Sequence, residues 1–363
     1  ILYPCKNLTS EEFKVASLFA STLTDVGIDN KDFEEVQRMQ SAYTGGISAN
    51  FSLVPDQDNY ALALQISSKS LEKNDKEMQD LMIQMVSKSN FTEKERIKDL
   101  LNFISSSNER SLIQNGHVLA MSNAGAQINN IASTSDIVSG LNFINYSSDL
   151  TKSIDKNENL EKYIDTLQSI KNKIILEPLH TFTATSLDMH KSMLSYQFGS
   201  SNDDKCHQEL LNIQEEKIGW ITGAQVCYCA EAFPTVGMDH DDAPALTVLG
   251  AVLRNGYLHS AIREKGGAYG AGASQDSKNK FFKFFSYRDP NCSNTFNEFA
   301  NAREWSLKNI TTAQLDEGVL GVISSIDKPL SPYGEAMNDF GSNIENKNIE
   351  LRFQFRAKVK ECT

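Results

Sequence analysis

The sequence predicts an α+β fold made of two tandem homologous domains, each a mostly antiparallel sheet packed against helices. Two observations predict it. Expected helices come in pairs and expected strands come as hairpins, whereas a doubly wound parallel sheet would alternate strand and helix regularly. The order of these elements in the first half of the chain also recurs in the second half. With 363 residues and an apolar content of 40%, the chain is long enough for two domains with their own cores.

The first half is expected to begin with a helix, because apolar residues recur near helical spacing in residues 10–26. A Gly-Gly step, Gly45-Gly46, then precedes two strands, and the second strand alternates apolar and smaller residues from Tyr60 to Ile66. The elements expected in this half are, in order, a helix at 10–26, strands at 47–54 and 60–66, helices at 72–88 and 92–114, more helix to about 172, and a strand at Thr181–Ser186.

The second half repeats this order around a second Gly-Gly step, Gly266-Gly267. Thr44–Ser48 parallels Lys265–Tyr269. We therefore expect an internal duplication, with a first domain at 1–178 and a second at 179–363, whose last strand would lie beyond the end of this chain. The elements expected here are a strand at 221–232, a helix at 242–263, strands at 268–274 and 280–287, and helices at 293–308 and 311–326.

Charge and hydropathy argue against two classes of partner. The net charge is −12, whereas a nucleic-acid-binding face needs clustered Lys and Arg, so we expect no nucleic acid. The acidic charge suits basic ligands, although solubility is the simpler explanation. No run of about 18 apolar residues occurs, so we expect no membrane span. Because the chain begins at Ile1 without a targeting segment, we expect it to be a piece of a longer protein.

The six cysteines predict neither a redox pair nor a zinc ribbon, because none of them forms C-x-x-C. Cys227 and Cys229 stand two residues apart in an expected strand, so they should point to the same face. We expect buried free thiols in a reducing compartment. The cysteines are Cys5, Cys206, Cys227, Cys229, Cys292 and Cys362.

No histidine pattern predicts a catalytic metal site. The spacings H-x-x-E-H and H-E-x-x-H, which place two imidazoles on one helix face, do not occur. The cluster Asp239–Asp242 precedes an expected helix, where acidic side chains cap free N–H groups. A metal-binding module at this cluster is the weaker alternative. His117 follows Gly116 in a helical stretch, where we expect a packed or hydrogen-bonded histidine.

The most informative segment is Ile262–Gly270. Arg263 closes an apolar helix, two glycines let the backbone turn sharply, and Tyr269 opens a strand whose small neighbours leave room for another chain. The G-x-x-G-x-G pattern from Gly267 resembles a nucleotide loop, but such a loop runs from strand into helix, and here the order is reversed. The structural alternative makes Arg263 a partner of the helix dipole and Tyr269 a core aromatic.

These segments resemble the C-terminal half of presequence proteases, a branch of the pitrilysin/insulinase superfamily of inverted zinc peptidases. The resemblance rests on Arg263–Gly270, on Phe284–Asn291, on Tyr43–Ala49 and on the stretch from Asn108 to His117, and it is collinear over nearly the whole chain. It implies the fold of that superfamily, the LuxS/MPP-like metallopeptidase fold, in which four such domains form two halves that close around a chamber.

The resemblance also implies a function. In such enzymes the N-terminal half carries zinc in an H-x-x-E-H site, so zinc would belong to the full-length enzyme and none of it to this chain. Arg263 and Tyr269 match a catalytic arginine and tyrosine, six residues apart, that reach the active site from the C-terminal half. The implied partners are the N-terminal half of the same polypeptide and unstructured peptide substrates. The isolated chain would be inactive.

The chemistry of the pair agrees with that role. A tyrosine hydroxyl aimed at the peptide carbonyl would stabilise the charge that develops there, and an arginine fork suits carbonyls or carboxylates. The alternative within the same superfamily is a catalytically silent scaffold or substrate-binding subunit. The expected location is the cytoplasm in a bacterium or the mitochondrial matrix in a eukaryote.

Overall fold

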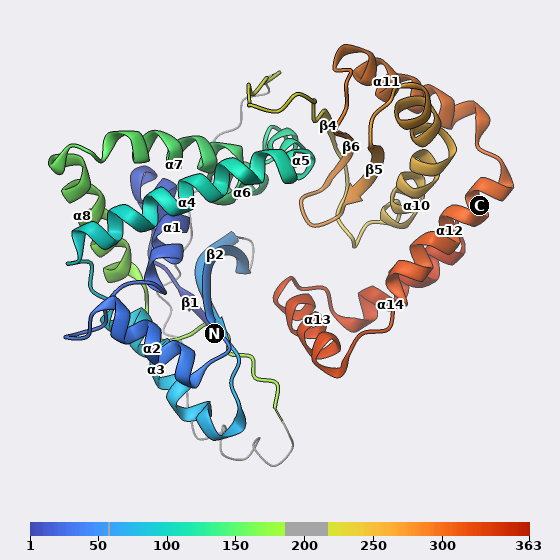
Figure 1. The fold of residues 1–363 in the computed structure, drawn as a ribbon. Coiled ribbons are helices and arrows are strands. Elements are labelled where there is room, and N and C mark those ends of the chain that lie inside the picture. The colour runs from blue at the N-terminus through green and yellow to red at the C-terminus, as the bar shows by residue number, and fades with distance from the viewer. Residues whose placement is uncertain (57–58, 186–216) are drawn as a thin grey trace. The chain divides into compact units, whose positions relative to one another are not determined.

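The computed structural model describes residues 1–56, 59–185 and 217–363. Helices and antiparallel strands are mixed in it, which confirms the predicted α+β class (Figure 1). By their contacts the described residues form two compact units. Unit 1 comprises 1–56, 59–109 and 137–185, and unit 2 comprises 110–136 and 217–363.

Unit 1 contains a three-stranded antiparallel sheet in the order β1-β3-β2. Its strands are β1 (Leu2–Pro4), β2 (Ile47–Asp56) and β3 (Asn59–Ser68). The β2–β3 hairpin is paired along its whole length. Beyond the last helix of the unit, the chain returns along β1 through single bridges from Cys5 to Ile174 and from Leu2 to His180.

The helices of unit 1 pack around a buried aromatic centre. They are α1 (Ser10–Leu23), α2 (Phe33–Tyr43), the 3₁₀ turn η1 (Glu72–Asn74), α3 (Asp75–Lys88), α4 (Lys94–Gln114), α6 (Asn130–Ser139), α7 (Leu141–Ser153) and α8 (Asn157–Lys173), of which α4 and α6 extend into unit 2. α1 lies against β2 and α8. Phe19 on α1 is fully buried, and its ring centroid lies 6.1 Å from that of Phe51 and 5.9 Å from that of Phe91.

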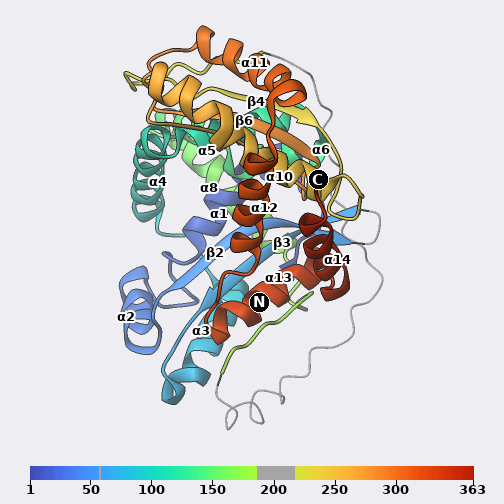
Figure 2. The same cartoon turned by 90° about the vertical axis from the view of Figure 1, so that its right-hand side faces the viewer.

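Unit 2 contains a second three-stranded antiparallel sheet, in the order β4-β6-β5. Figures 1 and 2 show β4 and β6 side by side near α10 and α11. The elements of this unit are α5 (Gly116–Ala126), β4 (Ala230–Pro234), α10 (Ala243–Leu253), the π-helix η2 (Arg254–Lys265), β5 (Gly270–Asp276), β6 (Phe281–Tyr287), α11 (Ser293–Asn309), α12 (Thr312–Ile326), α13 (Pro332–Ile344) and α14 (Ile349–Lys360).

Side chains of β6 alternate between two covered faces of this sheet. Phe282 and Phe284 belong to a core formed with α10, η2 and α11, where the rings of Phe284 and Phe299 lie 5.5 Å apart. Phe281 and Phe285 face α5 instead. The sheet is therefore covered on one face by the helices that surround it in sequence and on the other by a helix from much earlier in the chain.

α5 approaches the sheet so closely that two of its positions require glycine. A Cβ on Gly116 would lie within 3.0 Å of the ring of Tyr228, and a Cβ on Gly125 would lie within 3.0 Å of the ring of Phe281. Any larger residue would push the helix off the sheet. This packing explains why residues 110–136 belong to unit 2.

The two sheets share a topology, in agreement with the expected duplication. Each has its hairpin on one side and its first strand paired with the second hairpin strand. The Gly-Gly steps also correspond, because Gly46 has φ +100° and Gly267 has φ +80° just before β2 and β5. The division into homologous domains at 1–178 and 179–363, which rests on sequence similarity rather than on contacts, stays a prediction.

The strand expected at Thr181–Ser186 is wrong for its described part. Residues 181–185 form no strand, and Ser186 lies outside the described residues. The pairing with β1 ends at the bridge between Leu2 and His180, so the residues that follow have no neighbouring strand among those that the structure describes.

Two elements of the second half differ from expectation in their extent. The strand expected at 221–232 is shorter and later: β4 begins at Ala230, and Cys227 makes one isolated bridge to Asp289. The helix expected at 242–263 adopts π geometry after Leu253. Wider π turns are uncommon and are frequent at functional sites.

The cysteines follow the expectation in part. Cys5 and Cys229 are buried free thiols, whereas Cys292 is exposed, and Cys206 lies outside the described residues. Burial is the largest cause that raises the pKa of Cys229 to about 12, and the neighbouring Cys292 raises it further. Cys227 also contacts Cys292, so Cys227 and Cys229 share a face as predicted.

The α5–sheet contact makes the first testable prediction. Gly125→Ala should lower the free energy of unfolding by about 1–3 kcal/mol, because the new methyl group overlaps the Phe281 ring. The control is Gly341→Ala in α13, where a Cβ meets nothing within 4 Å and the helix should gain about 0.5–1 kcal/mol. Urea unfolding of both variants measures the two effects. Equal stabilities would show that α5 does not pack on the sheet in this way.

A buried ion pair in unit 1 controls stability at acid pH. The Glu12 side chain is 8% exposed and accepts hydrogen bonds from Lys173 Nζ at 2.5 Å, from Ser169 Oγ at 2.6 Å and from the Thr9 backbone N–H at 2.6 Å. Burial alone would raise the pKa of Glu12, but these donors outweigh it and lower that pKa from 4.5 to about 2.

The sign of the pH effect follows from this shift. The unfolded carboxyl binds a proton near pH 4.5 while the folded one stays ionised, so its stabilisation is complete above pH 5 and is lost between pH 5 and pH 2. Glu12→Gln should remove about 2–3 kcal/mol at pH 7 and flatten the pH dependence in that window. Urea unfolding from pH 7 to pH 2 measures it against Glu11→Gln, an exposed neighbour. An unchanged pH profile in Glu12→Gln would contradict the assignment.

Candidate functional site

A sharp turn joins η2 to β5 and positions the candidate residues. A Cβ on Gly266 would lie 2.5 Å from the carbonyl oxygen of Ile262, so no side chain fits there, and the φ of Gly267 is +80°. The Gly267 N–H donates to the Arg263 carbonyl at 3.0 Å, and the Ala268 N–H donates to the Ile262 carbonyl at 3.1 Å. These bonds satisfy the last carbonyls of the helix. The turn predicted from two glycines is confirmed.

Tyr269 lies on the surface of unit 2 with an anchored backbone. Its residue is 67% exposed, so the alternative of a core aromatic is wrong. Its N–H donates to the carbonyls of Tyr287 at 3.1 Å and Arg288 at 3.3 Å. The guanidinium carbon of Arg263 lies 5.9 Å from the centroid of the Tyr269 ring, within range of a cation–π contact. The structure therefore brings Arg263 and Tyr269 together.

The Arg263 side chain leaves the helix end rather than binding its carbonyls. Its Nη1 lies 3.4 Å from Nε2 of His259, one turn earlier. Nδ1 of the same imidazole lies 3.5 Å from a carboxylate oxygen of Glu264. All three side chains are exposed at the end of η2. The contact with the Tyr269 ring is the feature that separates this geometry from a simple partner of the helix dipole.

Tyr287 is the centre of an aromatic cluster that supports Tyr269 from behind. Its ring meets Tyr269 edge-on at 5.6 Å, and it meets His117 of α5 edge-on at 4.6 Å. Tyr228 lies 5.9 Å away, and the guanidinium carbon of Arg288 lies 5.4 Å from the Tyr287 centroid. His117 is thus a packed histidine, as expected, and burial lowers its pKa. Edge-to-face contacts of this kind hold the rings in fixed orientations.

A buried aspartate locks the turn that follows Tyr287. Asp289 is fully buried, and its carboxylate accepts a hydrogen bond from the Thr295 hydroxyl at 2.6 Å and from the Asn291 N–H at 2.8 Å. Its backbone pairs with Cys227. Arg288, just before it, has φ +48°, an unfavourable conformation for a residue with a Cβ. The local sequence contains this signal, because a Tyr-Arg-Asp-Pro run at a strand end predicts a turn, but only the resemblance singled it out.

The small residues after Tyr269 do not all leave open space. A Cβ on Gly272 would lie 2.8 Å from the Phe285 ring, so that glycine is required by packing within the sheet. A Cβ on Gly270 would meet nothing closer than 4.0 Å. Room for an approaching chain therefore exists beside Gly270 and not beside Gly272.

The acidic cluster before α10 is dispersed among other partners. Asp241 pairs with Lys358 of α14 at 2.5 Å. Asp242 is the residue that caps α10, as expected, but its side chain accepts no capping hydrogen bond; its N–H instead donates to His240 Nδ1 at 3.1 Å. Within residues 1–56, 59–185 and 217–363, no three His, Cys, Asp or Glu side chains gather as a metal site. These residues do not fit a zinc ion.

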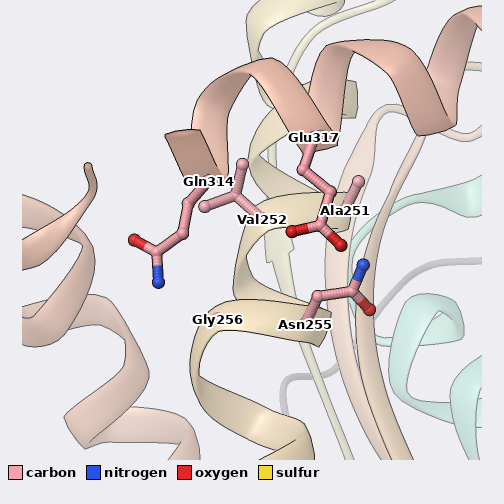
Figure 3. A pocket seen from close by; sticks show the side chains of 7 residues that line it. Ala251, Val252, Asn255, Gly256, Gln314 and Glu317 are labelled. Atoms are coloured by element: carbon pink, nitrogen blue, oxygen red, sulfur yellow. The ribbon is translucent and has the colours of Figure 1, made fainter. Parts of the chain in front are cut away.

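A shallow pocket between η2 and α12 is a gap in helix packing. Figure 3 shows Asn255 and Glu317 on opposite sides of it. Glycines bring the walls together, because a Cβ on Gly256 would lie 2.7 Å from the Trp305 ring. Neither member of the Arg263–Tyr269 pair lines it. Its lining residues are Ala251, Val252, Asn255, Gly256, Gln314, Glu317 and Gly318.

Comparison with known protein families agrees with the resemblance noted above. The family model for the region associated with peptidases of family M16, subfamily C, matches residues 1–150, and the model described as "PreP C-terminal domain" matches residues 221–363. The chain is the C-terminal part of an M16-family peptidase. Its mixed fold and the hairpin that carries Arg263 and Tyr269 are therefore those of an M16 unit.

Curated M16 relatives match along the full chain. A mitochondrial presequence protease of Drosophila melanogaster is 29% identical over 392 residues, and the alignment covers 100% of this chain and 36% of the relative. A mitochondrial presequence protease of Yarrowia lipolytica is 29% identical over 366 residues, with 96% and 36% covered. The chain thus spans just over a third of the length of these relatives.

Solved structures show the same fold at low identity. A peptidase M16 inactive domain from Pseudomonas fluorescens has a TM-score of 0.55 at 16% identity, covering 100% of this chain and 85% of that one. Pitrilysin has a TM-score of 0.52 at 13% identity, with 100% and 38% covered. In the part of the M16 chain that the structure describes, no helix is both long and apolar enough to cross a membrane.

The different burial of the two tyrosines makes a stability prediction. Tyr287→Ala should lower the free energy of unfolding by about 1–3 kcal/mol, because it removes the ring that contacts Tyr269, His117 and Tyr228. Tyr269→Ala should change it by less than about 1 kcal/mol, because that residue is exposed. Thermal unfolding of both variants provides the measurement. A larger loss for Tyr269→Ala would mean that Tyr269 is a packing residue.

Proposed function

We propose that this chain is the substrate-enclosing C-terminal part of a zinc peptidase that degrades unstructured peptides, and that Arg263 and Tyr269 are its contribution to catalysis. The observation that carries the proposal is the combination at Tyr269 of an exposed side chain and an anchored backbone. A packing residue would be buried, and a loop residue without function would not need two backbone hydrogen bonds and an arginine on its ring.

Each residue of the pair has a distinct role in this proposal. The Tyr269 hydroxyl donates a hydrogen bond to the carbonyl oxygen of the peptide bond under attack, where negative charge develops. Arg263 orients that hydroxyl through the face of the ring and offers its N–H groups to the peptide backbone. Both side chains are exposed in unit 2, so they act fully only when the rest of the polypeptide covers them and excludes water.

The zinc ion is proposed to lie in the part of the polypeptide outside this chain. The donor set for zinc is missing from the described residues, and the curated relatives are nearly three times as long as the matched region. The isolated chain should then be inactive. Because these relatives are described as mitochondrial, we propose the mitochondrial matrix as the location if the source is a eukaryote, and the cytoplasm if it is a bacterium.

The comparison between units 1 and 2 supports a specific role for the pair. Counting from Gly46 in unit 1 as from Gly267 in unit 2, the positions of Arg263 and Tyr269 correspond to Ala42 and Ser48. The turn is therefore kept in both units, whereas the arginine and the tyrosine occur in one. A pair required by the fold itself would be expected in both.

A catalytically silent scaffold is the second candidate. The similarity to a structure described as an M16 inactive domain favours it. The two candidates differ in one measurement, because a scaffold would bind an unstructured peptide without cleaving it. The retained Arg263–Tyr269 pair favours the peptidase.

The proposal predicts a specific loss of turnover. In the full-length protein, Tyr269→Phe and Arg263→Ala should each lower kcat on an unstructured basic peptide by about 10²–10³-fold. Thermal stability and zinc content should be unchanged, since both side chains are exposed and neither belongs to a metal site. Steady-state kinetics with zinc analysis on the same samples measures this.

Tyr333→Phe is the matched control, because Tyr333 is an exposed tyrosine of α13 with 61% of its surface accessible. It should retain wild-type turnover. Wild-type kcat in Tyr269→Phe would refute the catalytic role of Tyr269. Peptide binding without cleavage by the wild-type protein would instead favour the silent scaffold.

A further inference from the structure

Arg288 is exposed next to the Arg263–Tyr269 pair and plays no part in the mechanism above. Four side chains form what we call the Arg–Tyr row, namely Arg263, Tyr269, Tyr287 and Arg288. Each is in contact with the next: Arg263 lies over the Tyr269 ring at 5.9 Å, the two rings meet edge-on at 5.6 Å, and Arg288 lies over the Tyr287 ring at 5.4 Å. The row thus ends in a guanidinium on each side.

Neither guanidinium of the row is neutralised within the described chain. No carboxylate of the described residues lies within 4.0 Å of Arg263 or Arg288, although the chain contains 47 acidic residues. Other arginines do find such partners, as Arg96 does with Asp25 at 3.4 Å and Arg352 with Asp339 at 2.6 Å. An exposed guanidinium in a strongly acidic protein is normally easy to pair. Two unpaired ones beside two tyrosines are an arrangement suited to a ligand from outside.

The backbone at Arg288 is held in place against its own preference. A φ of +48° is costly for a residue with a Cβ, and glycine would adopt it without strain. Asp289, fully buried and bonded to Thr295 and Asn291, enforces the turn, and the Arg288 carbonyl accepts the Tyr269 N–H. Such strain persists where the surrounding structure over-determines it, and it concentrates at functional sites.

The ring of Tyr287 fixes the direction of the Arg288 side chain. A guanidinium that lies on an aromatic face keeps the N–H groups at its edge free. That edge is a planar fork, which matches the two oxygens of a carboxylate better than it matches a single carbonyl. Preorganisation by the ring also reduces the entropy that a long side chain loses on binding.

We propose that Arg288 binds a carboxylate of the peptide substrate and so selects peptides by charge next to the catalytic pair. This inference rests on the proposed peptidase function. Two sources can supply the carboxylate, namely the C-terminus of the peptide or an acidic side chain within it. Arg288 is thus a specificity residue, separate from the bond-breaking role proposed for Arg263 and Tyr269.

The test uses the full-length protein and matched peptides of one unstructured sequence. One pair differs only in a C-terminal carboxylate or amide, and a second set differs only in Glu or Gln at successive positions. Wild-type protein should favour the carboxylate member by about tenfold in KM, the effect of one charge-assisted hydrogen bond. Arg288→Ala should abolish that preference and leave the neutral peptides unchanged. The pair that loses its preference identifies the source of the carboxylate.

Two further variants separate recognition from folding. Arg288→Gly removes the side chain and relieves the strained φ, so its thermal midpoint should equal or exceed that of the wild type while the preference is lost. Arg38→Ala removes the same charge from α2 in unit 1, where Arg38 pairs loosely with Glu34 at 3.9 Å, and should leave the preference intact.

The outcomes distinguish this inference from the proposed function. A wild-type protein without charge preference, or an equal loss on charged and neutral peptides in Arg288→Gly, would overturn the carboxylate role. If no peptide is cleaved at all, fluorescence anisotropy of the same labelled peptides gives their dissociation constants. A carboxylate preference in binding that Arg288→Gly removes would then support the role of Arg288 while the peptidase function fails, and equal binding would overturn both.

Discussion

The turn from η2 into β5 is the constraint on which the site of unit 2 depends. The chain must pass from helix to strand within a few residues, and Gly266 and Gly267 allow it because one has no room for a Cβ and the other has a positive φ. The last carbonyls of η2 are satisfied inside the turn, so the turn is rigid. Rigidity holds Arg263 and Tyr269 side by side without any contact between more distant parts of the chain.

Behind this turn, the support for Tyr269 comes from a distant part of the sequence. Tyr287 holds the Tyr269 ring, and His117 and Tyr228 hold Tyr287 in turn. His117 belongs to α5, more than 150 residues earlier than Tyr269, and α5 reaches the sheet only because Gly116 leaves space for the Tyr228 ring. The orientation of the exposed residues therefore depends on packing across the whole of unit 2.

The comparison of the two units separates what belongs to the fold from what belongs to the site. Both have the same strand order and the same positive-φ glycine before the hairpin. Unit 1 has Ala42 and Ser48 where unit 2 has Arg263 and Tyr269. Folds of this kind are frameworks that carry different side chains, so the site must be argued from the chemistry of its residues rather than from the framework.

The sequence by itself determined the α+β class, the hairpins after each Gly-Gly step and the pairing of Arg263 with Tyr269, because these depend on local periodicity and on glycine conformation. Only the tertiary structure decided that Tyr269 is exposed, that Tyr287 and α5 support it, and that Arg288 stands unpaired in a strained turn. The same lack of long-range information explains the wrong strand at residues 181–185, whose pairing depends on the extent of β1. Contacts between residues far apart in the chain leave no periodic trace in either segment, so they can be found only in three dimensions.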